Sequence, residues 1–99
     1  MAALLIVNYN VTDRALLDEY REEAVPLLLG PGRGIPVAIS AATVDLNEGT
    51  PAGTDTVLLR YDSVEAAQAA FRSEAYQKAL KKRFDATEPR IGLIVETLD

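Results

Sequence analysis

The chain has 99 residues and a formal net charge of -5, with 48% hydrophobic residues, a quarter charged residues, and neither histidine nor cysteine. This length fits a single domain over residues 1–99, and the acidic balance opposes binding to nucleic acid. Without histidine or cysteine there is no imidazole or thiolate catalysis, no histidine-bound haem and no ordinary zinc site, so we expect neither metal nor cofactor.

The N-terminal segment is apolar and β-branched from Ala3 to Val11, which predicts a strand that runs into a helix cap at Asp13. It lacks the basic start and the apolar length of a signal peptide, so we expect a cytoplasmic protein with no membrane partner. From Arg14 onward, apolar residues recur at three- and four-residue spacing and predict a helix. Pro26 removes a backbone donor, so a kink or an early stop is expected there.

A loop rich in glycine and proline follows this helix, and a hairpin with a long loop follows in turn. Residues 35–46 and 56–62 are apolar and β-branched, which predicts two strands. Residues 47–55 between them are dense in turn formers. The two strands are therefore expected to pair with each other.

The C-terminal third predicts further helix and one more strand. Asp62 followed by Glu65 resembles a capping box that starts a helix, and Ser73 is placed to cap a second helical segment. Pro89 ends the approach to a strand over residues 90–97.

The resulting order, βαββαβ, predicts a ferredoxin-like α+β fold. Its antiparallel sheet has the strand order 4-1-3-2, with the helices on one face. In residues 4–7, 57–59 and 91–95, the side chains expected on both faces of the sheet are apolar. A sheet with one face in water should instead alternate apolar and polar residues along each strand. A second copy of the same sheet would cover the other face, so we expect a homodimer built as a dimeric α+β barrel.

Two segments resemble a known family. Val11-Thr-Asp13 leading to Tyr20, and the run from Asp62 to Gln77, are similar to the domain-of-unknown-function family 1330 over nearly the whole chain. The resemblance implies a dimeric α+β barrel, and more distantly a relation to cofactor-independent monooxygenases and small isomerases. The chain departs from the family pattern at 31–34, which lacks an aromatic residue, and at 40–42, where Ser-Ala-Ala replaces Arg-Gly-Gly.

Three polar residues on apolar elements are candidate ligand-binding residues. Tyr20 and Tyr76 lie on apolar helical stripes, where a tyrosine either packs its ring or donates a hydrogen bond to a ligand. Asn8 lies within the first strand, where an unpaired amide is costly, so a bound ligand or a buried water is expected to satisfy it.

Two arginines are candidates at one edge of the sheet. Arg33 in the glycine loop and Arg60 at a strand end are placed to form a weak anion site with the start of the second helix. The alternatives are a simple hinge for the loop and an ion pair with Glu96 for Arg60. The basic residues at 78 and 81–83 predict a solvated helix face, with an anion site as the alternative.

Two classes of function remain open. In the first, a pocket between sheet and helices binds, and as an enzyme transforms, a small apolar or aromatic metabolite without a cofactor, in the manner of a monooxygenase, isomerase or cyclase. In the second, the protein is a non-catalytic dimeric binding or regulatory module. The residue types present identify no catalytic base.

Overall fold

The computed structural model describes residues 1–99. Four strands and three helices follow one another along the chain, and the predicted second helical region is divided at Ser73 into two helices. The elements are β1 (Ala3–Val11), α1 (Arg14–Leu28), β2 (Ile35–Ser40), β3 (Asp55–Tyr61), α2 (Val64–Arg72), α3 (Glu74–Ala86) and β4 (Thr87–Glu96).

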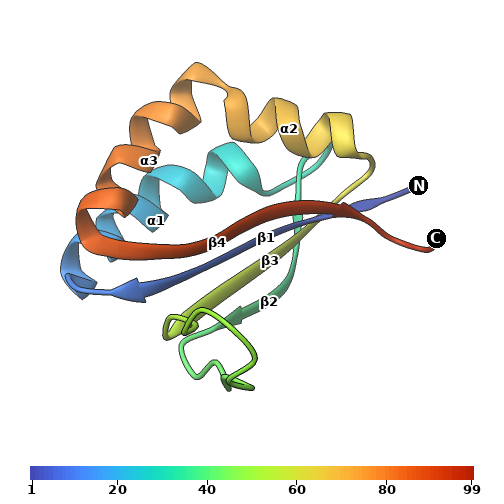
Figure 1. Ribbon diagram of the computed structural model, residues 1–99. Coiled ribbons are helices and arrows are strands. Elements are labelled where there is room, and N and C mark those ends of the chain that lie inside the picture. Colours follow the sequence, from blue (N-terminus) through green and yellow to red (C-terminus); the bar gives the residue numbers. More distant parts are fainter.

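The strands form one antiparallel sheet in the order β2-β3-β1-β4. In its centre Leu5 on β1 lies opposite Leu59 on β3 and Ile94 on β4. All three helices cover the same face of this sheet, and β4 is an edge strand (Figure 1). The predicted ferredoxin-like topology is therefore confirmed.

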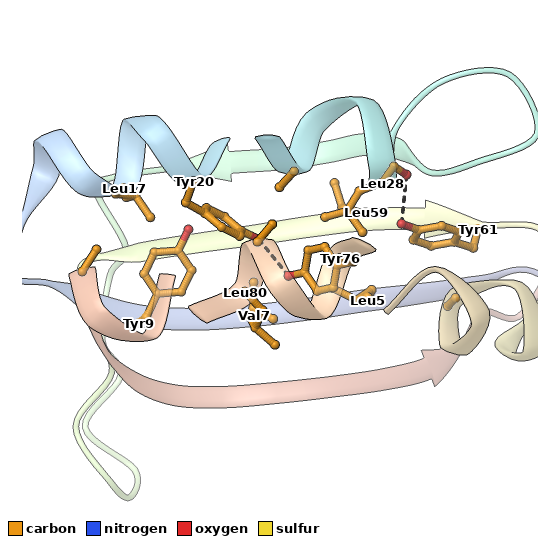
Figure 2. Close-up of a cluster of buried hydrophobic side chains, with 14 residues drawn as sticks. Leu5, Val7, Tyr9, Leu17, Tyr20, Leu28, Leu59, Tyr61, Tyr76 and Leu80 are labelled. Carbon is orange, nitrogen blue, oxygen red and sulfur yellow. Dashed lines mark hydrogen bonds between the residues drawn. The ribbon is translucent and has the colours of Figure 1, made fainter. Parts of the chain in front are cut away.

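The core lies between the sheet and the helices. Alternate residues of β1 point under the helices and are buried, while α1 and α3 contribute apolar stripes from above. All four tyrosines of the chain lie in this layer, as Figure 2 shows. They are Tyr9, Tyr20, Tyr61 and Tyr76.

The helix boundaries differ from the sequence prediction at two points. Pro26 lies inside α1, which continues until Leu28. The helix tolerates it because Pro26 and Glu22, whose carbonyl loses its partner, are both exposed to solvent. At the start of α2 the side chain of Ser63, rather than that of Asp62, accepts the hydrogen bond of a free backbone amide.

Two strand boundaries also differ. β2 ends at Ser40 because the chain then turns: the carboxylate of Asp45 accepts hydrogen bonds from the amides of Asn47 and Ala52. β4 begins at Thr87 and includes Pro89, which an edge strand can accommodate. No helix of the chain has the length and apolar character needed to cross a membrane.

Candidate functional site

A cavity of about 510 Å³ opens along the edge strand β4, beneath α2 and α3. Its volume lies within the range of about 300–1,000 Å³ that is typical of small-molecule sites. Most of its lining is apolar, and the charged side chains among the lining residues are all arginines. The lining comprises Leu5, Val7, Gln68, Phe71, Arg72, Arg83, Phe84, Pro89, Arg90, Ile91, Gly92, Leu93 and Ile94.

Gly92 leaves room in the floor of this cavity. It lies opposite Val7, which is buried on the helix-covered face of the sheet. A Cβ atom at Gly92 would meet no atom within 4 Å. The absence of a side chain at this position therefore contributes to the open volume.

Arg83 on α3 forms the buried end of the cavity, and its side chain lacks a protein partner. The residue is only 5% exposed, its Nε has no hydrogen-bond acceptor, and it belongs to no ion pair of the chain. Its guanidinium carbon lies 5.3 Å from the ring centroid of Tyr9, 5.9 Å from that of Tyr20 and 5.5 Å from that of Phe84. These rings attract the cation but accept no conventional hydrogen bond from Nε.

The sequence-based prediction of a solvated face was wrong for Arg83. Lys78 and Lys81 are exposed and Lys82 is partly exposed, where it pairs with Glu23. Arg83, however, continues the buried stripe of α3 because it lies at helical spacing from Tyr76, Ala79 and Leu80. This spacing was the available signal, and the positive charge of the residue obscured it.

Two further arginines lie at the mouth of the cavity. Arg72 ends α2 and is exposed, and Arg90 on β4 has its Nη2 atom 3.7 Å from Glu88 Oε1. No carboxylate is among the lining residues. The cavity is therefore a local positive region in a chain whose net charge is -5.

Tyr20 and Tyr76 bind each other. Their hydroxyl oxygens are 2.8 Å apart, and their rings meet edge to face with centroids 6.4 Å apart (Figure 2). Burial, followed by the neighbouring phenol of Tyr76, raises the pKa of Tyr20 far above its usual value, so the hydroxyl stays protonated. Both residues line a second, apolar cavity of about 70 Å³, and a direct role for them in ligand binding stays a prediction.

The amide of Asn8 is satisfied by the chain itself, not by the ligand or the water that the sequence analysis expected. Its Nδ2 donates to Gly53 O, Asp55 O and Thr56 Oγ1, and its Oδ1 accepts from Gly53 N at 2.7 Å. A Cβ atom at Gly53 would lie 2.1 Å from the carbonyl carbon of Tyr9. Asn8 therefore fixes the segment before β3 against β1.

Arg33 and Arg60 lie outside the cavity lining. Arg60 pairs with Asp99 at 2.5 Å rather than with Glu96, because the strand register places Arg60 and Glu96 on opposite faces of the sheet. Arg33 is exposed in the glycine loop. Ligand binding by these two residues stays a prediction.

The glycine loop has the geometry of a tight connection. Gly30 and Gly32 have φ angles of 123° and 74°, in the region that favours glycine. The carbonyl of Leu28 accepts hydrogen bonds from Gly34 N and from the hydroxyl of Tyr61. These contacts favour the hinge interpretation of the loop.

A buried carboxylate that the sequence analysis missed joins α1 to β3. Asp55 is 1% exposed and accepts hydrogen bonds from Arg14 Nη1 at 2.8 Å and Nη2 at 3.2 Å, while Arg21 lies at 3.5 Å. Burial raises the pKa of Asp55, but the hydrogen bonds from Arg14 and Thr54 and the charges of the two arginines outweigh it, so the pKa is lowered. No group of acidic side chains in the chain is arranged to hold a metal ion.

The strand order and the cavity define a ferredoxin-like α+β protein with a helix-covered pocket. The family model described as domain of unknown function (DUF1330) matches residues 2–98, and the chain belongs to this family. No curated protein matches the chain.

Solved structures share the fold at low sequence identity. A protein of unknown function from Rhodopseudomonas palustris has a TM-score of 0.76 at 18% identity, with 99% of this chain and 83% of that chain covered. A dimeric protein of unknown function and ferredoxin-like fold from Bacteroides fragilis has a TM-score of 0.61 at 14% identity, with 97% and 96% covered. A provisionally assigned antibiotic biosynthesis monooxygenase from Nitrosomonas europaea has a TM-score of 0.57 at 20% identity, with 98% and 89% covered.

Proposed function

We propose that the protein binds a small apolar or aromatic molecule in the cavity between β4 and helices α2 and α3. The observation that carries this proposal is a cavity of about 510 Å³ whose floor is apolar and whose buried end is the unpartnered Arg83. Apolar walls with a few convergent polar groups are typical of small-molecule sites. The similarity in fold to a provisionally assigned monooxygenase is consistent with such a site.

The lining favours binding over catalysis. Its polar side chains are Gln68 and three arginines. A glutamine does not titrate, and an arginine stays protonated at every physiological pH. The cavity therefore supplies orientation and charge but no acid or base, which favours a binding module.

We further propose that the protein is a homodimer joined through the sheet face that the helices leave open. Ile91, Leu93 and Val95 on β4 are 46%, 53% and 42% exposed. By register Val95 lies beside Leu4, and Leu93 lies beside Ile6, which in turn lies beside Leu58. An exposed apolar patch of this kind, bordered by the polar residues Asn8 and Arg60, marks an interaction site. The similar protein from Bacteroides fragilis is dimeric.

Narrowing the cavity tests the binding proposal. Gly92→Val adds a β-branched side chain where a Cβ atom meets nothing within 4 Å, so the variant should fold with unchanged or slightly raised thermal stability. Small aromatic compounds such as 2-naphthamide should raise the melting temperature of the natural chain, because a ligand that binds only the folded state stabilises it. The same compounds should raise the melting temperature of Gly92→Val by less, because the valine side chain occupies part of the cavity floor.

Gly49→Val is the matched control, since Gly49 also has open space but lies in the 41–54 loop, away from the cavity. It should respond to ligand like the natural chain. Equal ligand shifts in Gly92→Val and the natural chain would place binding elsewhere, and no shift with any compound would contradict the binding function.

A further inference from the structure

We propose that the cavity selects ligands that carry one carboxylate, and that the guanidinium of Arg83 receives it. This inference rests on the proposed binding function and specifies the chemical class of the ligand. It follows from three features of the site: an uncompensated buried charge, the way that charge is held, and the apolar character of the adjacent walls.

The charge of Arg83 has no counterion in the folded chain. Arg83 is only 5% exposed, and no carboxylate of the chain pairs with it. Removing a charged group from water is costly unless it is paired. Other buried or half-buried arginines here do have partners, because Arg14 and Arg21 share Asp55. Arg83 is the exception, and it lies at a cavity.

Aromatic rings hold Arg83 in place without using its hydrogen-bond donors. Tyr9, Tyr20 and Phe84 all lie within 6 Å of its guanidinium carbon. Cation–π contacts of this kind attract the charge as a whole and leave the N–H groups available. The chain satisfies neither the buried Nε nor the terminal nitrogens. The terminal nitrogens therefore remain for an external acceptor, and an arginine fork matches a carboxylate in a bidentate manner.

The local charge favours a singly charged ligand. One buried guanidinium is uncompensated, whereas Arg90 is already near Glu88 and Arg72 is exposed to solvent at the mouth. A carboxylate neutralises that one charge, while a dianionic phosphate would leave excess negative charge among apolar walls. Leu5, Val7 and Ile94, which line the same cavity as Arg83, suit an apolar body attached to the carboxylate.

The test compares matched carboxylates and amides. Binding of 2-naphthoate, phenylacetate and octanoate, each beside its primary amide, is measured by titration calorimetry on the natural chain, with 2-naphthyl phosphate as a further probe. A hydrogen-bonded charge pair predicts that the best acid binds about tenfold to a hundredfold more tightly than its amide. The phosphate should bind more weakly than 2-naphthoate.

Arg83→Met keeps an unbranched side chain and removes the charge. It should lower the affinity for the acid at least to that for the amide and should lower the affinity for the amide much less, because a neutral amide loses only a hydrogen bond whereas the carboxylate loses a charge pair. Lys81→Met is the matched control, because Lys81 is exposed on the same helix, and it should retain the preference for the acid. Should Arg83→Met fail to fold, the natural chain still decides the ligand class, and Arg83→Lys, which keeps the charge but not the planar fork, tests the role of Arg83 by a reduced preference for the acid.

The outcomes separate the two proposals. Amides that bind as tightly as their acids overturn the carboxylate assignment and leave the binding function standing. Phosphate that binds more tightly than carboxylate overturns the singly charged class. A preference for acids that persists in Arg83→Met overturns the role of Arg83. Failure of every acid and every amide to bind contradicts the binding function itself.

Discussion

The paired hydroxyls of Tyr20 and Tyr76 show how a polar contact can be hidden in an apolar layer. The two groups are buried and have only each other as partners, at 2.8 Å. A buried hydroxyl without a partner costs about 1–3 kcal/mol, whereas removing both members of a pair is nearly neutral. The contribution of each tyrosine to stability therefore depends on the presence of the other.

Tyr76→Phe should lower the free energy of unfolding by about 1–3 kcal/mol, because it leaves the buried hydroxyl of Tyr20 without a hydrogen-bond partner. Tyr20→Phe should have a similar effect. The double variant should be less destabilised than the sum of the single variants, with a coupling of about 0.5–3 kcal/mol. Urea unfolding of the four proteins measures this coupling, and additive effects would show that the hydroxyls do not depend on each other.

At the scale of elements, the contact that Asp55 makes between α1 and β3 depends on pH. Folding lowers the pKa of Asp55, so its ionised form favours the folded chain at pH values above the usual carboxyl pKa of about 3.9. This contribution is lost as the pH falls through the pKa of the folded state. The attachment of α1 to the start of β3 should therefore weaken in acid.

Asp55→Asn should lower the free energy of unfolding at pH 7 by about 1–3 kcal/mol, because it removes the acceptor of a charged hydrogen bond from Arg14. Its stability should then decline less steeply below pH 4 than that of the natural chain. Urea titrations at a series of pH values measure both effects. Asp62→Asn, at an exposed carboxyl without an ion pair, is the control and should retain the steep decline.

The sequence predicts elements better than it predicts the partners of charged side chains. The strand and helix order is readable because apolar spacing and turn formers are local signals, and the family segments at 11–20 and 62–77 agree with it. Asp55 was missed because its partners Arg14 and Arg21 are distant in the chain. Arg83 was misread because its environment depends on rings from β1 and α1. Partners that only the folded chain brings together leave no local pattern.

At the scale of the whole molecule, the helices protect one face of the sheet and leave the other apolar and open (Figure 1). Because all three helices lie on one side of the sheet, they cannot cover its other face. A second copy would bury the apolar residues of β4 and of the central strands. Substitutions on the open face should therefore change the oligomeric state more than the stability of the single chain.

Val95→Lys should convert a dimer into a monomer, because it places a charge on the open face, where Val95 is 42% exposed. Sedimentation velocity at micromolar concentration measures the change. Val44→Lys is the matched control, since Val44 is 82% exposed but lies in the 41–54 loop, and it should remain dimeric. A natural chain that sediments as a stable monomer would contradict the homodimer.

Because every tyrosine is buried, the absorption of the tyrosine side chains reports on the packing of the core. The chain has no tryptophan, so its near-ultraviolet signal comes from four tyrosines and two phenylalanines. Because all four phenol rings lie in one packed layer, near-ultraviolet circular dichroism follows that layer without any attached dye. Arg83 contacts two of these rings, Tyr9 and Tyr20, so an anion that reaches the guanidinium alters the electric field on the chromophores themselves.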